Sequence, residues 1–468
     1  MVTAQKDNAF LGTEPVGKLL FKLALPTVAA QLINMLYNIV DRIYIGHMPG
    51  DGALALTGVG VCMPVIMLVS AFAALVSMGG APRASIFMGK GDPESAERTL
   101  GNCFVLQIGL SLVLTAVLLL WNRDFLLAFG ASDNTIAYAT GYMNVYALGT
   151  LFVQLTLGMN AFITAQGFAK MGMVTVLIGA LCNIALDPLF IFVFGMGVQG
   201  AALATILSQG VSCVWVVLFL CGRKTLLRLR LSRMRLRPKL LFPCLALGLS
   251  PFIMQASESI ISVCFNASLL KYGGDLAVGA MTILTSVMMF AMMPLQGLAQ
   301  GAQPISSYNF GARNAERVKK TFKLLLISCM VYSTTLWALV QLFPGMFAAL
   351  FTDNAALIEY TETALRVYCA VMLLFGAQIA CQMTFISLGR AAESILVAVM
   401  RKFVLLLPLI YLMPLLLDDR ALAVYAAEPV ADLLAVTFTV LLFAGKFRRI
   451  LRTLDQPLAV PAPAEQVN

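Results

Sequence analysis

The chain has 468 residues, of which 60% are hydrophobic and only 12% are charged. A soluble protein of this length carries about twice that fraction of charged residues, so the composition excludes an ordinary water-soluble protein and predicts an all-α integral membrane protein. The net charge of +9 is spread over the loops between apolar stretches, as membrane topology requires, and does not indicate nucleic-acid binding.

Apolar stretches that reach the ~20 residues needed to cross a bilayer recur along the whole chain. We expect about twelve spans, at residues 19–45, 54–80, 99–121, 134–158, 169–194, 199–221, 240–270, 275–300, 321–344, 357–388, 394–417 and 421–445. The opening residues are polar and lack the apolar core of a secretory signal, so the first span is expected to be retained.

Basic residues gather in alternate loops, most densely between the sixth and seventh spans. Short basic loops stay in the cytoplasm, so both termini are predicted to be cytoplasmic. The domains expected are a cytoplasmic N-terminal segment (1–18), an N-lobe (19–221), a basic cytoplasmic linker (222–239), a C-lobe (240–445) and a cytoplasmic tail (446–468). The last residues, Pro457 to Asn468, are polar and rich in proline and alanine, and are predicted to be disordered.

An internal repeat relates the two lobes. Several residues recur at a displacement of 222: Gly79, Pro82, Gly89 and Glu94 as Gly301, Pro304, Gly311 and Glu316. Many secondary transporters are built from two homologous membrane halves, with the binding site between or within them. The repeat therefore favours a transporter.

Motifs for other chemistry are missing from the sequence. There is no G-x-x-x-x-G-K-[ST] motif for a nucleotide-driven motor. With His47 as the single histidine and ten scattered cysteines, we expect neither a metal site nor another cofactor. An intramembrane enzyme would need a nucleophile–base pair or a metal cluster, so an enzyme is not expected. Transport would draw on an ion gradient, a membrane potential or the substrate's own gradient.

The first span carries polar residues three or four positions apart, on one helix face: Gln31, Asn34, Asn38 and Asp41, with Tyr37 beside them. Such a stripe should face a bundle interior or a water-filled cavity, and an ionisable residue at membrane depth is by default a functional-site hypothesis. We expect Asp41 to exchange a proton or cation. The alternative is a structural carboxylate paired with Arg42.

The fifth span holds Asn183 and Asp187 four residues apart, followed by Pro188. Proline lacks an N–H, so the carbonyl of Ile184 loses its usual donor. Amide, carboxylate and free carbonyl together would suit a proton relay or a hard cation such as Na⁺. The alternative is a proline kink capped by Asp187. Pro26, Pro188 and Pro251 are all expected to help helices bend.

The seventh span carries a second polar face, expected to line the cavity: Gln255, Glu258, Ser262 and Asn266. Glu258 could bind a cationic substrate or couple ions, or it could be the partner of a buried base such as Arg366 or Arg401. On the last span, Glu428 and Asp432 are expected to pair with Arg401 or Lys402.

At these residues the chain resembles the multidrug and toxic compound extrusion family, and within it the branch of a staphylococcal multidrug efflux pump. The stretches that carry the resemblance are Leu25-Pro26 with Tyr37–Asp41, Gly79–Pro82 with Gly89–Asp92, Asn183–Pro188, Gly200–Thr205, and Gly301–Pro304 with Tyr308–Gly311.

The resemblance implies two six-helix lobes in a V and alternating access driven by H⁺ or Na⁺. It also implies an N-lobe coupling site, which falls on Asp41, Asn183, Asp187 and Thr205. Other branches of the family use a carboxylate on span seven, where Glu258 stands, together with an aspartate on span ten. That aspartate has no evident counterpart here.

We therefore expect an inner-membrane antiporter that exports amphipathic, cationic small molecules in exchange for H⁺ or Na⁺. It would act as a monomer in the lipid bilayer without a nucleic-acid partner. The alternative is a lipid or lipid-linked oligosaccharide flippase of the same superfamily, which would need a cationic cavity for pyrophosphate. The loops after spans two and eight do not fit the G-x-x-x-D-R-x-G-R-R signature of the major facilitator superfamily.

Overall fold

The computed structural model describes residues 9–48 and 52–455, which are almost entirely helical. The first half contains α2 (Ala9–Thr13), α3 (Val16–Gly46), α4 (Gly52–Gly89), α5 (Pro93–Ala128), α6 (Ile136–Leu148), α7 (Thr150–Ala165), α8 (Ala169–Pro188), the π-helical turn η1 (Leu189–Val193) and α9 (Gly197–Cys221). Residues 1–8 of the expected N-terminal segment and residues 456–468 of the tail lie outside the described ranges.

The second half begins after the linker, which contains the short turn η2 (Leu231–Arg233). Its helices are α10 (Pro238–Gly311), α11 (Ala315–Leu342), α12 (Pro344–Ala349), α13 (Ala355–Tyr368), η3 (Met372–Leu374), α14 (Phe375–Ser387), α15 (Ala391–Val399), the π-helical η4 (Met400–Leu406), α16 (Leu407–Leu416) and α17 (Arg420–Asp455).

Within the described ranges, nine helices are long and apolar enough to cross a membrane, or eleven when each of two sharply bent pairs is taken as one span. The bent pairs are α6 with α7 and α13 with the η3–α14 segment. Helix α10 has 74 residues and is interrupted at Gly274, whose φ is +65°, so it covers two of the expected spans. The all-α membrane fold of about twelve spans is thus confirmed.

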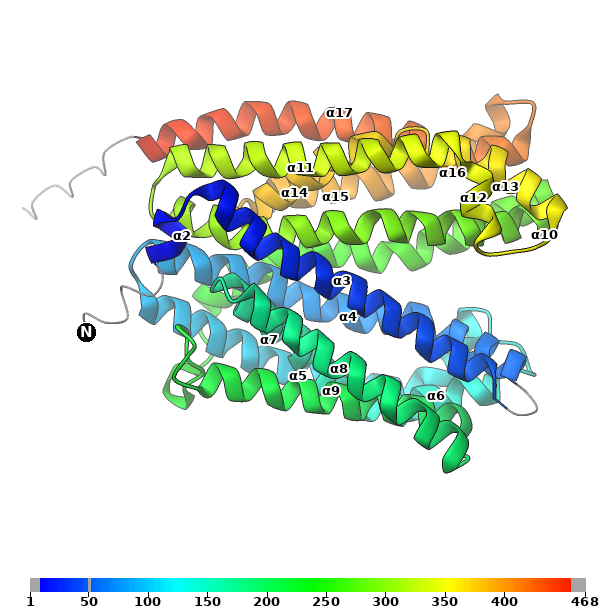
Figure 1. Ribbon diagram of the computed structural model, residues 1–468, viewed down its shortest axis with the longest axis horizontal. Coiled ribbons are helices and arrows are strands. Elements are labelled where there is room, and N and C mark those ends of the chain that lie inside the picture. Colours follow the sequence, from blue (N-terminus) through cyan, green and yellow to red (C-terminus); the bar gives the residue numbers. More distant parts are fainter. Residues whose placement is uncertain (1–8, 49–51, 456–468) are drawn as a thin grey trace, which may run out of the picture.

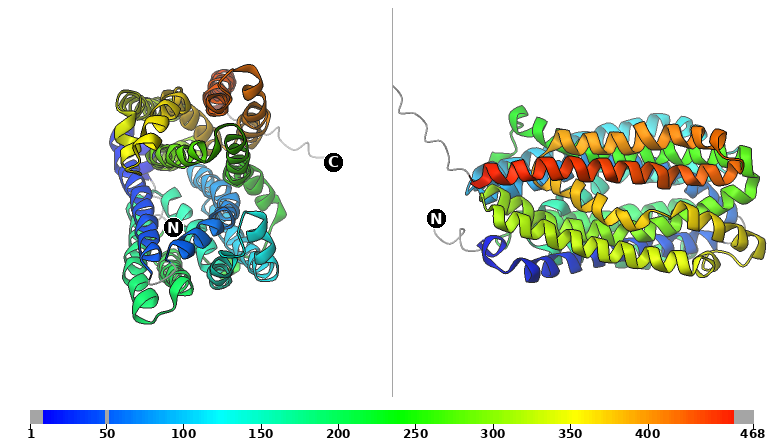
Figure 2. Two further views of the ribbon diagram at one scale, coloured as in Figure 1. Left: turned by 90° about the vertical axis from the view of Figure 1, so that its right-hand side faces the viewer. Right: turned by 90° about the horizontal axis from the view of Figure 1, so that it is seen from above.

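The helices form two groups that follow the two halves of the sequence. Figure 1 shows α4 to α9 in the lower group and α11 to α17 in the upper group. Seen along the helices, the two groups are stacked one above the other (Figure 2, left). The described start of the chain, the basic linker and the end of α17 lie at the same end of the molecule (Figure 1).

Helix α3 connects the two groups. Leu19 and Leu23, near the N-terminal end of α3, belong to the same buried core as Leu284 and Phe375 of the second half of the chain. Ile45, near its other end, belongs to a core formed by the first half. The polar stripe that follows Thr27 therefore lies where α3 passes from one lobe to the other, and this position determines what the stripe faces.

Candidate functional site

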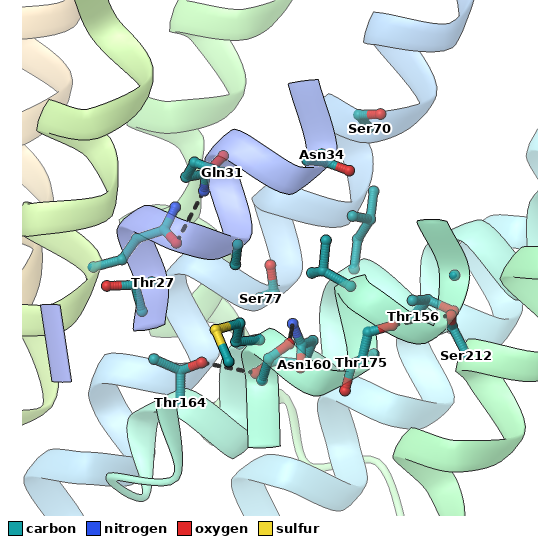
Figure 3. Close-up of a pocket in the computed structure, with 18 of the residues that line it drawn as sticks. Thr27, Gln31, Asn34, Ser70, Ser77, Thr156, Asn160, Thr164, Thr175 and Ser212 are labelled. Carbon is teal, nitrogen blue, oxygen red and sulfur yellow. Dashed lines mark hydrogen bonds between the residues drawn. The ribbon is translucent and has the colours of Figure 1, made fainter. Parts of the chain in front are cut away.

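A cavity of about 340 Å³ opens inside the first half, against α10 of the second half. Its walls come from α3, α4, α7, α8, α9 and α10. Figure 3 shows Thr27 and Gln31 of α3 on one side and Thr156, Thr175 and Ser212 on the opposite side. Six helices from both halves therefore contribute to one polar space.

The described residues that line this cavity carry no formal charge. They are mainly hydroxyl and amide side chains, with Tyr37 as their single aromatic residue. Helix α10 contributes four glutamines: Gln255, Gln296, Gln300 and Gln303. Gln31 donates a hydrogen bond to Gln300 across the lobe boundary, with 3.2 Å between Nε2 and Oε1. The lining therefore offers hydrogen-bonding groups but no formal charge to a ligand in this cavity.

The predicted lining residues separate into two sets. Gln31, Asn34, Tyr37 and Gln255 line the cavity, whereas Asn38, Glu258, Ser262 and Asn266 do not. The amide of Asn38 instead donates to the carbonyl oxygen of Asn34 at 2.6 Å. The other three lie together on the exposed side of α10. The second set was placed by helical spacing alone, which does not say which neighbour each face meets.

Asp41 and Asp187 come together next to the cavity. Their side chains are close enough to interact electrostatically, although 146 positions separate them. Asp187 is fully buried, and its Oδ1 accepts from Asn183 Nδ2 at 3.2 Å. Two carboxylates in contact repel each other unless a proton or a cation lies between them. The pair is therefore a candidate site for a proton or a cation.

Three side-chain oxygen atoms of this pair and of the adjoining Asn183 lack a partner. Oδ1 of Asp41, Oδ1 of Asn183 and Oδ2 of Asp187 are buried without a hydrogen-bond partner in the described structure. Arg42 forms no salt bridge with Asp41 within the residues described. Buried polar atoms are normally satisfied, so this oxygen cluster is a candidate binding site for a proton or a cation.

Thr205 contributes a hydroxyl group to the cavity lining. Its Oγ1 donates to the carbonyl oxygen of Ala201 at 3.0 Å, and its side chain also interacts with that of Tyr142. Tyr142 and Tyr146 are buried and stack with ring centroids 6.2 Å apart. Neither tyrosine is among the site residues predicted from the sequence. Their spacing of four in α6 was an available signal, but nothing in the sequence connects α6 with Asp41.

Asp187 lies directly before a change in helical geometry. The α-helical part of α8 ends at Pro188 and continues as the π-helical turn η1. Proline cannot donate to the preceding turn, so a change in helical geometry at this point is expected. At Pro26 and Pro251 the helical backbone of α3 and α10 continues without such a change.

The second half holds a separate cluster of charges. Lys402 donates to Glu258 with 2.6 Å between Nζ and Oε1. Arg401 Nε donates to Asp432 Oδ1 at 2.7 Å, and a second nitrogen of Arg401 lies 3.7 Å from Glu428. Both bases are buried. The pairing expected for Glu428 and Asp432 is therefore present, and the partner of Glu258 is Lys402 rather than Arg366 or Arg401.

The chain matches the MatE family model over residues 26–189 and 251–412. It is 25% identical over 362 residues to the multidrug export protein MepA of Staphylococcus aureus strain NCTC 8325, which covers 77% of this chain and 79% of the relative. A MepA from Staphylococcus haemolyticus strain JCSC1435 is 23% identical over 359 residues, 77% of this chain and 78% of the relative.

The fold is shared with solved structures of similar length. An outward-facing multidrug resistance MATE transporter superimposes with a TM-score of 0.89 at 23% identity, over 97% of this chain and 99% of the other. A transporter of the MOP superfamily from Pyrococcus furiosus Vc1 gives 0.88 at 22% identity, over 95% and 98%. Since the family model covers well over half of the sequence, the chain belongs to the multidrug and toxic compound extrusion (MATE) family.

Proposed function

We propose that this multi-pass membrane transporter is a secondary active exporter of amphipathic, cationic small molecules, driven by inward movement of H⁺ or Na⁺. The observation that carries the proposal is the electrostatic interaction of Asp41 and Asp187 next to an uncharged cavity, whose lining residue Asn183 donates to Asp187. Relatives named multidrug export protein support the cargo class. Coupling ion and cargo would use neighbouring but chemically different parts of one site.

The exchange of ion for cargo follows if the two bind preferentially to different states of the transporter. A proton or Na⁺ between Asp41 and Asp187 relieves the repulsion of the carboxylates and favours one arrangement of the helices around them. Loss of that ion restores a negative site that attracts a cationic cargo. An ion and a cargo that each stabilise a different state of the transporter are exchanged across the membrane. Asn183 and Thr205 would orient the carboxylates and complete an oxygen ligand set.

The remaining expectations belong to the same proposal. The basic linker, the described start of the chain and the end of α17 lie at one end of the molecule, which supports cytoplasmic termini under the positive-inside rule. The carboxylate pair and the uncharged cavity favour an organic cation over a pyrophosphate-linked lipid. We expect the transporter to act as a monomer in the bacterial inner membrane.

The test is efflux of ethidium from proteoliposomes that contain the purified protein. A pH gradient and a Na⁺ gradient are imposed separately, with Asp41→Asn and Asp187→Asn as test variants. Asp133→Asn, which changes an exposed carboxylate outside the helices, is the matched control. The proposal expects efflux under one of the gradients, lost in both test variants and kept in the control. Gradient-dependent efflux that persists in both test variants would contradict it.

A further inference from the structure

The basic linker is bonded to the first half of the chain and is not a free tether. The fully buried Gln166 accepts, through Oε1, hydrogen bonds from the backbone N–H groups of Leu226 and Leu227 at 2.9 and 2.8 Å. The side chains of Leu227 and Leu229 belong to a core cluster formed mainly by the first half. Releasing the linker would leave a buried amide oxygen without partners, so the start of the linker keeps one position.

The end of the linker is held in the same way, against α5. Asn102 is fully buried; its Nδ2 donates to the carbonyl oxygen of Arg235 at 3.1 Å, and its Oδ1 accepts from the N–H of Arg237 at 2.6 Å. A Cβ on the neighbouring Gly101 would lie 2.7 Å from the carbonyl oxygen of Arg233, so glycine lets the linker approach this closely. The side chains of residues 233–237 therefore project from a fixed backbone.

The basic side chains of the linker fall into two sets. Arg230 Nε lies 3.7 Å from a carboxylate oxygen of Glu97 on α5. Arg233 donates to Glu94, also on α5. Three bases that follow are exposed and form no salt bridge within the residues described: Arg235, Arg237 and Lys239. The charge of this second set is left for a partner outside the chain.

These three bases lie beside the lipid-facing side of α10. Phe242 and Leu249 are exposed and seven residues apart on this apolar helix, so their face of the helix meets lipid. Lys239 precedes Phe242 by three residues and shares its face. The backbone is extended at Arg237, and alternate residues of an extended chain, such as Arg235 and Arg237, project to the same side. The bases therefore stand where α10 enters the membrane.

We propose that Arg235, Arg237 and Lys239, together with Phe242, form a binding surface for the headgroup of an anionic phospholipid. Basic clusters next to a spanning helix attract anionic lipids, and a guanidinium donates paired hydrogen bonds to a phosphate. The acyl chains would lie along the apolar face that starts at Phe242. Because Asn102 holds the backbone at both arginines, less conformational freedom is lost on binding than in a flexible basic tether. This surface lies apart from the cavity, so its ligand is independent of cargo and coupling ion.

The experiment measures equilibrium binding of phosphatidylglycerol with a fluorescent acyl chain to the purified full-length protein in neutral detergent micelles. Phosphatidylcholine with the same chains is the reference lipid. We expect phosphatidylglycerol to bind at least about tenfold more tightly, since each basic residue near an anionic headgroup contributes about fivefold. Combining Arg235→Gln, Arg237→Gln and Lys239→Gln should reduce this preference to below about threefold.

The matched control removes three exposed positive charges from the last turns of α17: Arg448→Gln, Arg449→Gln and Arg452→Gln combined. These residues follow the last expected span, and the preference for phosphatidylglycerol should stay within about twofold of that of the natural protein. An equal loss in both triple variants would assign the preference to net charge and overturn the proposal. Equal binding of the two lipids by the natural protein would overturn it as well.

Asn102→Leu tests the role of the fixed backbone, because it keeps every charge and removes the bonds to Arg235 and Arg237. The preference for phosphatidylglycerol should fall at least about threefold. Gln166→Leu, which frees the start of the linker, takes its place if Asn102→Leu does not fold. An unchanged preference would show that a flexible basic tether suffices, and would overturn the site. Displacement of the bound lipid by millimolar inorganic phosphate alone would assign the surface to free phosphate and also contradict the proposal.

Discussion

Gly89 and Gly311 occupy equivalent places on opposite sides of the boundary between the two lobes. A Cβ on Gly89 of α4 would clash with the carbonyl oxygen of Tyr308, and a Cβ on Gly311 of α10 would clash with that of Ile86. The displacement of 222 residues relates Gly89 to Gly311 and Ile86 to Tyr308. The sequence repeat is therefore also a repeat of contacts, and it lets two helix backbones approach each other closely.

The first prediction concerns these glycines. Gly89→Ala and Gly311→Ala should each lower the free energy of unfolding by about 1–3 kcal/mol, because inserted methyl groups force packed helices apart. Gly109→Ala is the control: a Cβ at Gly109 meets nothing within 4 Å, so this change should be neutral or stabilising by up to about 1 kcal/mol. Thermal melting in detergent measures all three. Equal shifts for the test and control variants would refute the close-packing account.

The second prediction concerns the ion pair of Glu258 and Lys402. The Lys402 side chain is only 4% exposed, whereas that of Glu258 is 52% exposed. Glu258→Gln leaves a buried ammonium without its nearest partner and should cost about 3 kcal/mol. Lys402→Met should cost less, because the carboxylate that remains is half exposed in the structure and not buried.

A double-mutant cycle tests this pair. Combining Glu258→Gln with Lys402→Met should recover at least half of the stability lost in Glu258→Gln, since no unpaired charge then remains at this position. Melting temperatures of the four proteins give the coupling. If the two changes are additive, the side chains are not energetically coupled, and Glu258 would again be a candidate for cargo or ion binding.

The third prediction concerns how α2 is held. Arg317 donates to the carbonyl oxygens of Leu11 and Glu14 at 3.0 and 2.8 Å and to Asn309 Oδ1 at 3.0 Å. Arg317→Met removes all three bonds, each worth about 1.5–3 kcal/mol when the donor is charged. Amide hydrogen exchange at residues 10–14 should therefore become at least tenfold faster. This corresponds to a loss of about 1.4 kcal/mol in the free energy of local opening.

Lys320→Met, one turn further along α11, is the matched control for the loss of one positive charge. Exchange at residues 10–14 should stay within about twofold of the natural protein in this variant, since hydrogen bonds and not net charge hold α2. Equal acceleration in both variants would assign the effect to charge and remove the role given to Arg317.

The fourth prediction is a pH dependence at the start of α5. Hydrogen bonds from Ser95, including its backbone N–H at 3.0 Å, lower the pKa of Asp92 below its ordinary value of 3.8. A lowered folded-state pKa gives stability that is complete above the unfolded value and is lost as pH falls through the folded value. Asp92→Ala should therefore cost about 1 kcal/mol at neutral pH.

The difference in melting temperature between the natural protein and Asp92→Ala should shrink once the pH falls below 3.8. Asp92→Ser keeps an oxygen that can cap the helix but does not titrate, so its own capping contribution should stay constant over that range. If the difference in melting temperature between the natural protein and Asp92→Ala stays the same down to the lowest pH, the charge of the Asp92 carboxylate does not contribute to capping the helix.

The helices were predictable because their apolar runs are long. The expected span at 19–45 corresponds to α3, and the one at 199–221 to α9. The short helix α2, the bends at Gly149 and Cys369, and the π-helical turns have no comparable signature. They depend on how neighbouring helices pack, which an apolar composition does not determine.

The site was predictable only where one helix carries several of its members. The spacing of Gln31 and Asn34 identifies a polar face, and both line the cavity. Polar stripes at helical spacing are also present on α7 (Thr156, Asn160 and Thr164) and on α9 (Thr205, Gln209 and Ser212), and all six residues line the cavity, although only Thr205 is among the residues predicted from the sequence. Helical spacing could not choose Lys402 as the partner of Glu258, because 144 positions separate the two residues.

The most direct test of the central claim reverses the exchange. Proteoliposomes are loaded with ethidium and given no ion gradient, and the movement of H⁺ or Na⁺ into or out of the vesicles is recorded as the dye leaves. Because coupling is reciprocal, the account predicts that one ion moves opposite to the dye, and that Asp41→Asn and Asp187→Asn each abolish this ion movement. Dye exit with no movement of either ion, or ion movement unchanged in both variants, would contradict coupling through the carboxylate pair.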